Sequence, residues 1–560
     1  MIDDYYSKSD TPISTNSLDK KNFYIGMISQ VSERNITIQI DNLSLLTHRI
    51  LRQTDLIPNT INYYVVVDSI SGIYFGQVIQ NDVPKGLSRT QMLDEKNIGL
   101  IGVEATIDIL GFEEFGTKKF YLTGFSRPGI AEKVYLADRE VVNHFIDSIE
   151  IQSKESQKNE GTPVQTISFA HLSNIKDTEL KLHPDTLFNR HLLTVGATNS
   201  GKSTSALSIL DQLIRHQTKI LLIDPTGEYR ESFDKKEMKH LTLGINTTVP
   251  VGELTMQHWS MLFDCNENTQ EAVLSEAIRS LRYQKKNELK GILKKEGNPY
   301  KDIQDKLATV TTNDTDFEIN DLISQISAEA VDLGNNRNQR EIYVPSTFRF
   351  NTYQWLTQKI SNQFDNTSII RFFSSNSTKP SANLIDELNL FASTPNTSLY
   401  VDASEIGTTD GVGGMVVDLI TNYLLNLHDT QNNPFVIFVD EVHRYAKRFD
   451  SSQRYYSGLT SVAREGRKKG IFLFLTTQNP NDVAPELLGQ IGTMLIHRLT
   501  HQNELSAIHN NVGDASFNQI RRLNQGEAIL TSVNLLEDLH ISVDRCSRQH
   551  DNATPSLSKP

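Results

Sequence analysis

The sequence predicts an α/β protein with a largely parallel sheet, preceded by a small N-terminal β-barrel and carrying a helical insertion. Three observations lead to this fold class. Between residues 23 and 136, short β-branched runs alternate with turns, as in a small antiparallel barrel or sandwich. Further along, continuous apolar runs each precede a helical pattern, which is typical of strands buried on both faces. A charged segment with helical spacing interrupts this second part.

The chain has 560 residues, too many for one compact core, so we expect several domains. Changes in pattern and polarity set their boundaries. The expected parts are a flexible N-terminus (1–21), a β-barrel domain (22–150), the first part of the α/β core (165–265), the helical insertion (266–347), the second part of the core (348–546) and a C-terminal tail (547–560).

Composition excludes several classes of protein. The formal net charge of -13 argues against a basic coat for nucleic acid, so any contact with DNA must come from local patches. The two cysteines, Cys265 and Cys546, form neither a disulfide framework nor a zinc spacing. No signal peptide precedes the barrel, and no apolar run approaches the roughly 18 residues of a membrane span. We therefore expect a cytoplasmic protein without a membrane partner.

Six apolar runs are the candidate core strands. They are HLLTVG (191–196), KILLID (219–224), LYVD (399–402), FVIFVD (435–440), IFLFLTT (471–477) and TMLIHR (493–498).

The first of these runs leads into the sequence GATNSGKS, which fits the phosphate-binding pattern GxxxxGK[ST]. Gly196 and Gly201 permit a close backbone approach, and the backbone N–H groups with the following helix start form a cradle for phosphate oxygens. Lys202 can reach the β- and γ-phosphates, and the Ser203 hydroxyl can ligate Mg²⁺. The predicted nucleotide-binding residues of the loop are Gly196, Asn199, Ser200, Gly201, Lys202, Ser203 and Thr204.

An acidic pair, Asp440 and Glu441, ends the apolar strand FVIFVD. Alone, such a pair is usually a solvated strand end. After a phosphate-binding loop, it predicts that Asp440 holds the Mg²⁺ shell and that Glu441 deprotonates the attacking water. A base at this position favours ATP hydrolysis over a kinase, and no NKxD motif supports a GTPase.

Four further stretches resemble one family. IDPTGEY (223–229), DEVHR with AREGRKKG, and TTQNP follow the loop in the order found in the HerA branch of the HerA/FtsK ATPases. Thr226 and Val442 depart from the family's usual DPHGEY and DEAH, without loss of a charged group. The resemblance implies a RecA-like P-loop motor core, with the N-terminal β segment similar to the barrel that precedes it. It also implies a homo-hexameric ring that moves double-stranded DNA through a central channel.

The resemblance assigns further residues. It implies that Gln478 is a sensor of the γ-phosphate or the lytic water, and that Arg467, or else Arg464, is a finger reaching the nucleotide of a neighbouring subunit. The remaining residues that it places around the nucleotide are Asp224, Glu228 and Arg190. Physically, a guanidinium stabilises the charge that spreads over the γ-oxygens in the transition state. The alternative is that these arginines belong to a solvated basic helix face.

Two functions stay open at this stage. One is a DNA translocase of helicase type that works with a partner nuclease. The other is an ATP-gated ring scaffold that docks an anti-phage effector on its barrel, because HerA-like proteins also resemble ring components of bacterial defence systems. No cluster of nuclease carboxylates is evident in this chain, so either function requires a separate protein for cleavage. A monomeric P-loop kinase or GTPase is a third, disfavoured class.

Overall fold

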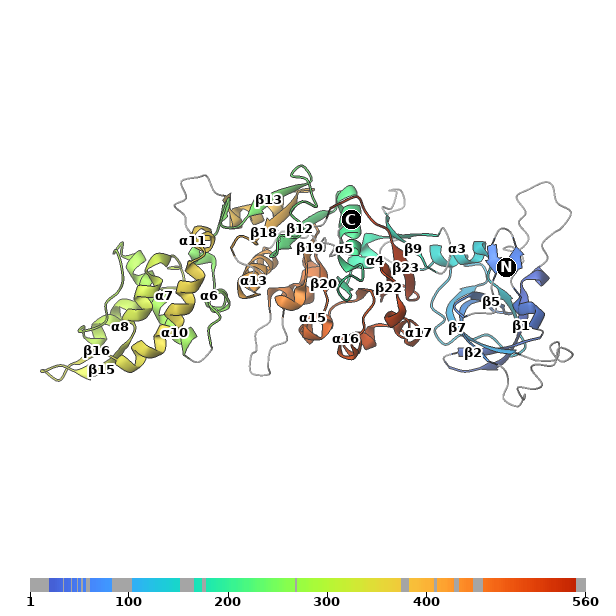
Figure 1. Cartoon of the computed structure of the whole chain (residues 1–560), viewed down its shortest axis with the longest axis horizontal. Helices are drawn as coiled ribbons and strands as arrows, with labels where there is room; N and C mark the ends of the chain where they lie inside the picture. The colour runs from blue at the N-terminus through green and yellow to red at the C-terminus, as the bar shows by residue number, and fades with distance from the viewer. Residues whose placement is uncertain are drawn as a thin grey trace, which may run out of the picture. The chain divides into compact units, whose positions relative to one another are not determined.

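A computed structural model of the chain gives the arrangement of its elements (Figure 1). The residues that it describes are 20–33, 35–41, 43–47, 49–51, 54–56, 61–82, 103–151, 166–173, 178–266, 269–373, 382–406, 410–427, 433–446 and 457–549. The chain forms two compact units. Unit 1 comprises Met1–Leu187, Gly196–Ser208 and Gly492–Arg545, and unit 2 comprises Phe188–Val195, Ile209–Ile491 and Cys546–Pro560.

Unit 1 begins with a closed antiparallel barrel in the strand order β1-β2-β7-β6-β5-β8. Its strands are β1 Tyr24–Val31, β2 Asn35–Ile40, β5 Tyr64–Asp68, β6 Gly72–Asp82, β7 Val103–Glu114 and β8 Lys133–Leu136. Alternate residues fill the interior, as Ile36, Ile38 and Ile40 of β2 do. Of the two architectures that the alternation left open, the barrel is the one observed.

Helix α3 (Arg139–Asp147) follows the barrel and begins at Asp138, whose carboxylate accepts the Arg139 N–H. Its Phe145 ring stacks on Phe75 of β6, with centroids 4.2 Å apart. A second, smaller hairpin in this unit consists of β3 Arg49–Leu51 and β4 Thr54–Leu56.

The rest of unit 1 is an antiparallel array in the order β10-β9-β23-β22-β21. Its strands are β9 Ile167–Leu172, β10 Glu179–Leu182, β21 Thr493–Ile496, β22 Glu527–Ser532 and β23 Leu539–Val543. The associated helices are α4 Pro184–Phe188, α16 Gln502–Ile508 and α17 Asp514–Phe517. The apolar run at 493–498 is therefore a strand, as expected, and it pairs antiparallel with β22.

Unit 2 is built on parallel strands in the order β11-β20-β19-β12-β18-β13. They are β11 Leu192–Val195, β12 Lys219–Asp224, β13 Met238–Thr242, β18 Ser398–Asp402, β19 Phe435–Val439 and β20 Ile471–Thr477. Every residue of β12, β18 and β19 is buried, which confirms the prediction of parallel strands covered on both faces.

The α/β part of the chain contains further helices and two short strands. Helix α5, Lys202–Arg215, leads out of the phosphate-binding loop. The other elements are α12 Leu384–Ser393, α13 Asp410–Asn426, α14 Gly458–Glu465, α15 Pro485–Leu488, β14 Thr247–Thr248 and β17 Ala382–Asn383. In the part of the chain that the structure describes, no helix combines the length and the apolar character that crossing a membrane requires.

The insertion is helical, as predicted, but its helices continue beyond residue 347 (Figure 1, yellow-green). They are α6 Met256–Leu262, α7 Gln270–Lys286, α8 Tyr300–Ala308, α9 Leu322–Ala328, α10 Thr347–Phe364 and α11 Thr367–Phe372. The sequence analysis missed a hairpin formed by β15 Val331–Asn335 and β16 Glu341–Pro345. Val331 and Tyr343 of this hairpin pack with Ile303 and Leu307 of α8 in a small separate core.

Candidate functional site

The phosphate-binding loop of unit 1 follows β11 and leads into α5. Asn199 and Gly201 have φ angles of 65° and 110°, both in the left-handed region. Such residues turn successive backbone N–H groups toward one side of the loop, which produces a concave, anion-binding backbone. Asparagine adopts the left-handed conformation more readily than most residues, so its presence in place of the usual glycine is compatible with this geometry.

The loop rests on segments of unit 1 that lie some 300 residues further along the chain. The Ala197 N–H donates to the Arg498 carbonyl at 3.1 Å, and the Gly526 N–H donates to the Ser200 carbonyl at 3.0 Å. A side chain on Gly201 would come within 3.0 Å of the Gly526 backbone. The absence of a side chain at Gly201 therefore allows the two backbones to approach this closely.

His497 lies beneath the loop and is fully buried. One ring nitrogen, Nδ1, donates to the Glu527 carbonyl at 2.8 Å, and Nε2 accepts from the Ser205 hydroxyl at 2.9 Å. Burial, with the nearby Lys202 charge, lowers the pKa of His497 to about 4, although the bond to Glu527 opposes this shift. A neutral histidine thus fixes the first turn of α5, a role that no local pattern indicated.

In unit 2, Asp440 and Glu441 directly follow β19, next to the carboxyl end of β20. The Thr476 hydroxyl donates to the Asp440 carboxylate and accepts the Glu441 N–H at 3.0 Å. Glu441 has φ 48° and ψ 50°, a left-handed conformation that is strained for a residue with a side chain. The threonine therefore holds both acidic residues at the strand end.

The structure brings Gln478 to Glu441. The Gln478 side-chain amide donates to Oε1 of Glu441 at 2.5 Å, and its backbone N–H donates to Oε2 at 3.1 Å. His443 Nδ1 lies 3.2 Å from the same Oε2. Three of the residues predicted for hydrolysis, Asp440, Glu441 and Gln478, thus form one cluster, together with His443, which the sequence analysis left without a role.

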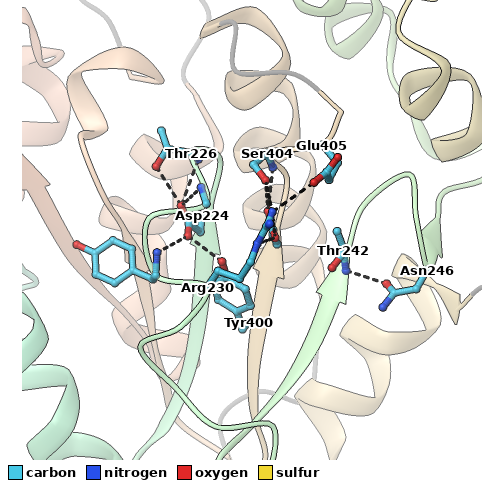
Figure 2. Close-up of polar contacts among 11 residues, drawn as sticks. Asp224, Thr226, Arg230, Thr242, Asn246, Tyr400, Ser404 and Glu405 are labelled. Atoms are coloured by element: carbon cyan, nitrogen blue, oxygen red, sulfur yellow. Dashed lines mark hydrogen bonds and ion pairs between the residues drawn. The ribbon is translucent and has the colours of Figure 1, made fainter. Parts of the chain in front are cut away.

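Asp224, at the end of β12, is buried and engaged by its own loop (Figure 2). Its carboxylate accepts the N–H groups of Gly227 at 2.8 Å and Tyr229 at 2.9 Å, and the Tyr400 hydroxyl at 2.8 Å. Thr226 contributes two further donors. Burial raises the pKa of Asp224 despite these bonds. In this geometry the carboxylate shapes the DPTGEY turn, of which Glu228 is the next acidic member.

The neighbouring strand β18 ends in Asp402, which repeats this arrangement; its partners Arg230 and Ser404 are labelled in Figure 2. Its carboxylate accepts the Ser404 N–H at 3.0 Å and pairs with Arg230 at 2.9 Å. Arg230 in turn reaches Ser404 and Glu405. The carboxyl ends of β12 and β18 are therefore rigid, polar turns rather than open side chains.

The predicted arginines lie at the amino-terminal ends of the parallel strands, opposite the carboxyl ends that carry the acidic cluster. Arg464 lies in the last turn of α14, and Arg467 lies in the 3₁₀ turn that precedes Ile471, the first residue of β20. Arg190 comes two residues before Leu192, the start of β11. A seven-residue strand spans about 20 Å. The two ends of β20 are thus separated by roughly that distance. The structure does not group these arginines with Glu441.

His191 fixes the arginine-bearing turn at this amino-terminal edge. Its Nε2 donates to the Ala463 carbonyl at 3.0 Å, and its Nδ1 accepts the Leu473 N–H at 2.9 Å. Burial lowers the pKa of His191 to about 4, the bond to Ala463 opposes the shift, and the nearby Arg467 charge adds to it. Two buried histidines, one in each unit, are therefore neutral in the folded chain.

We expect acid to destabilise the fold through these two histidines. An unfolded histidine binds a proton below about pH 6.5, whereas His191 and His497 stay neutral down to about pH 4. Stability therefore decreases as the pH falls from about 6.5 toward 4, by about 1.4 kcal/mol per pH unit for each histidine. Urea unfolding at pH 7.5, 6.0 and 5.0 measures this slope. The His497→Asn variant should flatten it, whereas replacing the exposed His501 by Gln should not; equal slopes would contradict the assignment.

The donor groups fit a nucleotide and a divalent cation. The concave backbone at Asn199 and Gly201, with Lys202, suits phosphate oxygens. Among oxygen groups of the kind that Mg²⁺ takes, unit 1 offers the Ser203 hydroxyl and unit 2 the Asp440 carboxylate. Within unit 2, Glu441 is a group that can accept a proton from water.

Family models match most of the chain beyond the barrel. Residues 167–424 match the central domain of helicase HerA, and residues 415–534 match the HerA-like C-terminal domain. The chain is 23% identical over 389 residues to "Probable helicase MJECL08" of Methanocaldococcus jannaschii, covering 66% of this chain and 69% of that protein. It is 22% identical over 423 residues to "DNA double-strand break repair helicase HerA" of Sulfurisphaera tokodaii, and the match covers 71% of this chain and 76% of that protein.

Solved structures of similar fold include VirB4 of Thermoanaerobacter pseudethanolicus, with a TM-score of 0.45 and 14% identity over 70% of this chain and 98% of that one. The plasmid coupling protein TrwB in complex with the ATP analogue ADPNP has a TM-score of 0.45 and 14% identity, and the match covers 73% of this chain and 95% of that one.

Proposed function

Because the chain belongs to the HerA family of helicase-type ATPases, we propose that it is a hexameric motor that hydrolyses ATP and moves along double-stranded DNA. The relatives named as HerA are DNA double-strand break repair helicases, which supports DNA as the substrate. Both cysteines are free, which fits a reducing cytoplasm.

In this proposal, ATP and Mg²⁺ are the cofactors. The backbone of Gly196, Ser200 and Gly201 and the Lys202 amine bind the phosphates, flanked by Asn199 and Thr204. Ser203 and Asp440 hold the Mg²⁺. The bound cation would neutralise charge on the phosphate oxygens during transfer.

Glu441 is the proposed base for the attacking water, and Gln478 the sensor of the γ-phosphate. Asp224 was expected to line the nucleotide site; with its oxygens engaged by Gly227, Tyr229 and Tyr400, we propose instead that it shapes the turn that presents Glu228.

The observation that supports a site shared between copies is the separation of the arginines from the acidic cluster. Arg464, Arg467 and Arg190 lie at the amino-terminal edge of the parallel strands, about 20 Å from the edge where Glu441 lies. An arginine side chain reaches much less than this distance. This separation supports a role for these guanidiniums at the nucleotide of a neighbouring copy, which would complete the site.

Dilution tests this proposal directly. ATPase activity per chain should fall steeply at concentrations where native mass measurement shows rings dissociating into single copies. The same measurement is made with and without ATP and duplex DNA. A verified single-copy preparation that hydrolyses ATP at the full rate per chain would refute the shared site.

DNA stimulation provides a second test. An acidic particle can bind DNA only through local basic patches, so binding depends on the release of counterions. We expect duplex DNA to raise the ATPase rate at 50 mM salt and to lose about three orders of magnitude in affinity by 200 mM salt. A hexamer that shows no DNA-dependent rise at low salt, alone or with the product of the adjacent gene, would contradict a translocase.

The barrel surface supports a second candidate function, a ring scaffold that docks a nuclease or an anti-phage effector. The segment between β7 and β8 exposes Phe125 and Ile130, and Ile70 on the neighbouring turn is almost fully exposed as well. A hydrogen bond of 2.8 Å from Ser69 to Glu132 holds that turn against the segment. Two exposed apolar side chains on one segment, with a third on the turn bonded to it, suit a surface that another protein covers.

We expect the Phe125→Ser and Ile130→Ser double variant to lose its complex with the product of the adjacent gene, while its ATPase rate stays unchanged. Native mass measurement of the mixture reports the complex. The control is Lys118→Ser, an exposed position in the same segment. If the double variant retained the complex, the docking surface would lie elsewhere.

A further inference from the structure

The hairpin of β15 and β16 is a part of the insertion to which neither the motifs nor the nucleotide site assigns a role. Its base is anchored, because Val331 and Tyr343 pack with α8 in the small core of the insertion. Beyond Tyr343, the residues of both strands are exposed or half-buried. The end of the hairpin extends past α8 (Figure 1). Its outer half therefore projects from the insertion.

The tip of the hairpin, residues 336–340, is a turn that its own backbone holds in place. The Asn336 N–H donates to the Arg340 carbonyl at 2.9 Å, and the Gln339 N–H donates to the Asn336 carbonyl at 3.0 Å. The side-chain oxygen of Asn336 accepts the N–H groups of Asn338 at 2.9 Å and Arg340 at 3.0 Å. The side chains that follow Asn336 are thus not needed to fix the turn.

Four consecutive side chains at the tip are exposed and make no hydrogen bond or ion pair within the described residues. They are Arg337, Asn338, Gln339 and Arg340. At the base of the hairpin, by contrast, Arg349 pairs with Asp332 at 2.7 Å. Residues 333–340 contain no acidic residue, and the next one is Glu341, at the start of β16. The tip is therefore a local positive patch on a chain with a net charge of -13.

The residue types at the tip match the groups that duplex DNA presents. A guanidinium binds phosphate oxygens or the two acceptors of guanine, and a side-chain amide pairs with adenine. The centre of a protein–protein interface is instead apolar and aromatic, and the tip has no apolar side chain. The tip therefore favours nucleic acid over a protein partner.

The dimensions of the hairpin suit the major groove. Three residues separate Tyr343 from Arg340, which corresponds to about 10 Å of strand. The major groove is about 8.5 Å deep and about 12 Å wide, and it admits a two-stranded ribbon. The minor groove is about 6 Å wide, too narrow for two strands about 4.8 Å apart with their side chains.

We propose that the hairpin of β15 and β16 binds duplex DNA by inserting its tip into the major groove. Arg337 and Arg340 contact phosphates along the groove, and the amides of Asn338 and Gln339 face the base edges. Phosphate contacts carry no sequence information, so a motor can use them anywhere along the duplex. This inference rests on the proposed function as a DNA motor, and it adds a DNA contact on the insertion.

The double variant Arg337→Gln and Arg340→Gln tests the contact in the full chain. We expect its affinity for duplex DNA at about 100 mM salt to fall about 10- to 100-fold, because two phosphate contacts are lost. The slope of log Kd against log salt should decrease by about 1.8, since each contact contributes about 0.9. Fluorescence anisotropy of a labelled duplex measures both quantities. The ATPase rate without DNA should stay within about twofold of wild type, because the tip lies outside the proposed catalytic residues.

The matched control is Lys301→Gln and Lys306→Gln on α8, which removes the same charge from the same insertion. Both lysines are exposed, but they alternate with Asp302 and Asp305 on a helix surface. This variant should keep the affinity and the salt slope of wild type. Equal losses in the two double variants would reveal a general effect of charge and overturn the role of the hairpin. Thermal melting and native mass verify folding and assembly of each.

A second duplex tests the groove. Glucosylated hydroxymethylcytosine in place of cytosine fills the major groove and leaves the phosphates unchanged. Wild type should bind this duplex as weakly as the arginine double variant does, and the double variant should bind both duplexes equally. Equal binding of the two duplexes by wild type would overturn insertion into the major groove.

The outcomes separate this inference from the proposed function. If wild type binds duplex DNA and the arginine double variant binds it equally well, the hairpin is excluded as the contact while the DNA motor stands. If wild type binds no duplex DNA at low salt, both the hairpin contact and the DNA motor are refuted.

Discussion

The Glu441→Gln variant should retain ATP and lose hydrolysis. We expect turnover to fall about 10²- to 10⁴-fold, the contribution of a positioned general base, while ATP affinity stays within threefold of wild type. Glutamine keeps the shape of the side chain, but it cannot take a proton from water. Filter binding with labelled ATP and a phosphate-release assay measure the two quantities.

The matched control is Glu486→Gln, an exposed glutamate on α15, which should behave as wild type. Lys202→Ala supplies the opposite pattern, because losing the phosphate contact should abolish binding together with turnover. Undiminished turnover in the Glu441 variant would assign the base elsewhere.

The Arg467→Ala variant should assemble normally and lose about 10³- to 10⁵-fold in turnover, the range attributed to an arginine finger. The side chain lies at the amino-terminal edge of β20, so its removal leaves the same chain's own acidic cluster intact. Native mass reports assembly, and phosphate release reports turnover.

Arg464→Ala is the comparison. The variant that loses more turnover identifies the arginine finger, and full turnover in both variants would exclude both residues from that role.

Mixing experiments decide whether the arginine acts between copies. Rings mixed from Arg467→Ala and Lys202→Ala chains contain interfaces that combine an intact phosphate-binding loop with an intact neighbouring arginine. Activity should therefore reappear in the mixture although each variant alone is inactive. No recovery in rings shown by native mass to be mixed would refute a contribution in trans.

The sequence allowed prediction of those features whose signal is local. The phosphate-binding loop lies within eight consecutive residues, so its pattern and its place between strand and helix could be recognised directly. Continuous apolar runs such as 219–224 and 435–440 indicated parallel strands because both faces of these strands are buried. The residues of the acidic cluster could be predicted for the same reason, because Asp440 and Gln478 each lie at the end of such a run.

Features that depend on contacts distant in sequence could not be predicted. Nothing near the loop indicates that His497 and Gly526, some 300 residues away, support it. The apparent role of Asp224 also changed, because only the fold shows that Tyr400 of another strand occupies its carboxylate. The hairpin at 331–345 had a local signal in its Asn-rich tip, but the helical spacing on either side obscured it.

The placement of the arginines gives the proposed assembly a sense of rotation. In the proposed ring, an Arg467 that acts on a neighbouring copy would do so across one flank, and the nucleotide of its own copy would depend on the copy at the other flank. A change at one nucleotide is consequently communicated clockwise or anticlockwise, and never both. In the proposed hexamer, six such couplings would form a closed circle with a single direction.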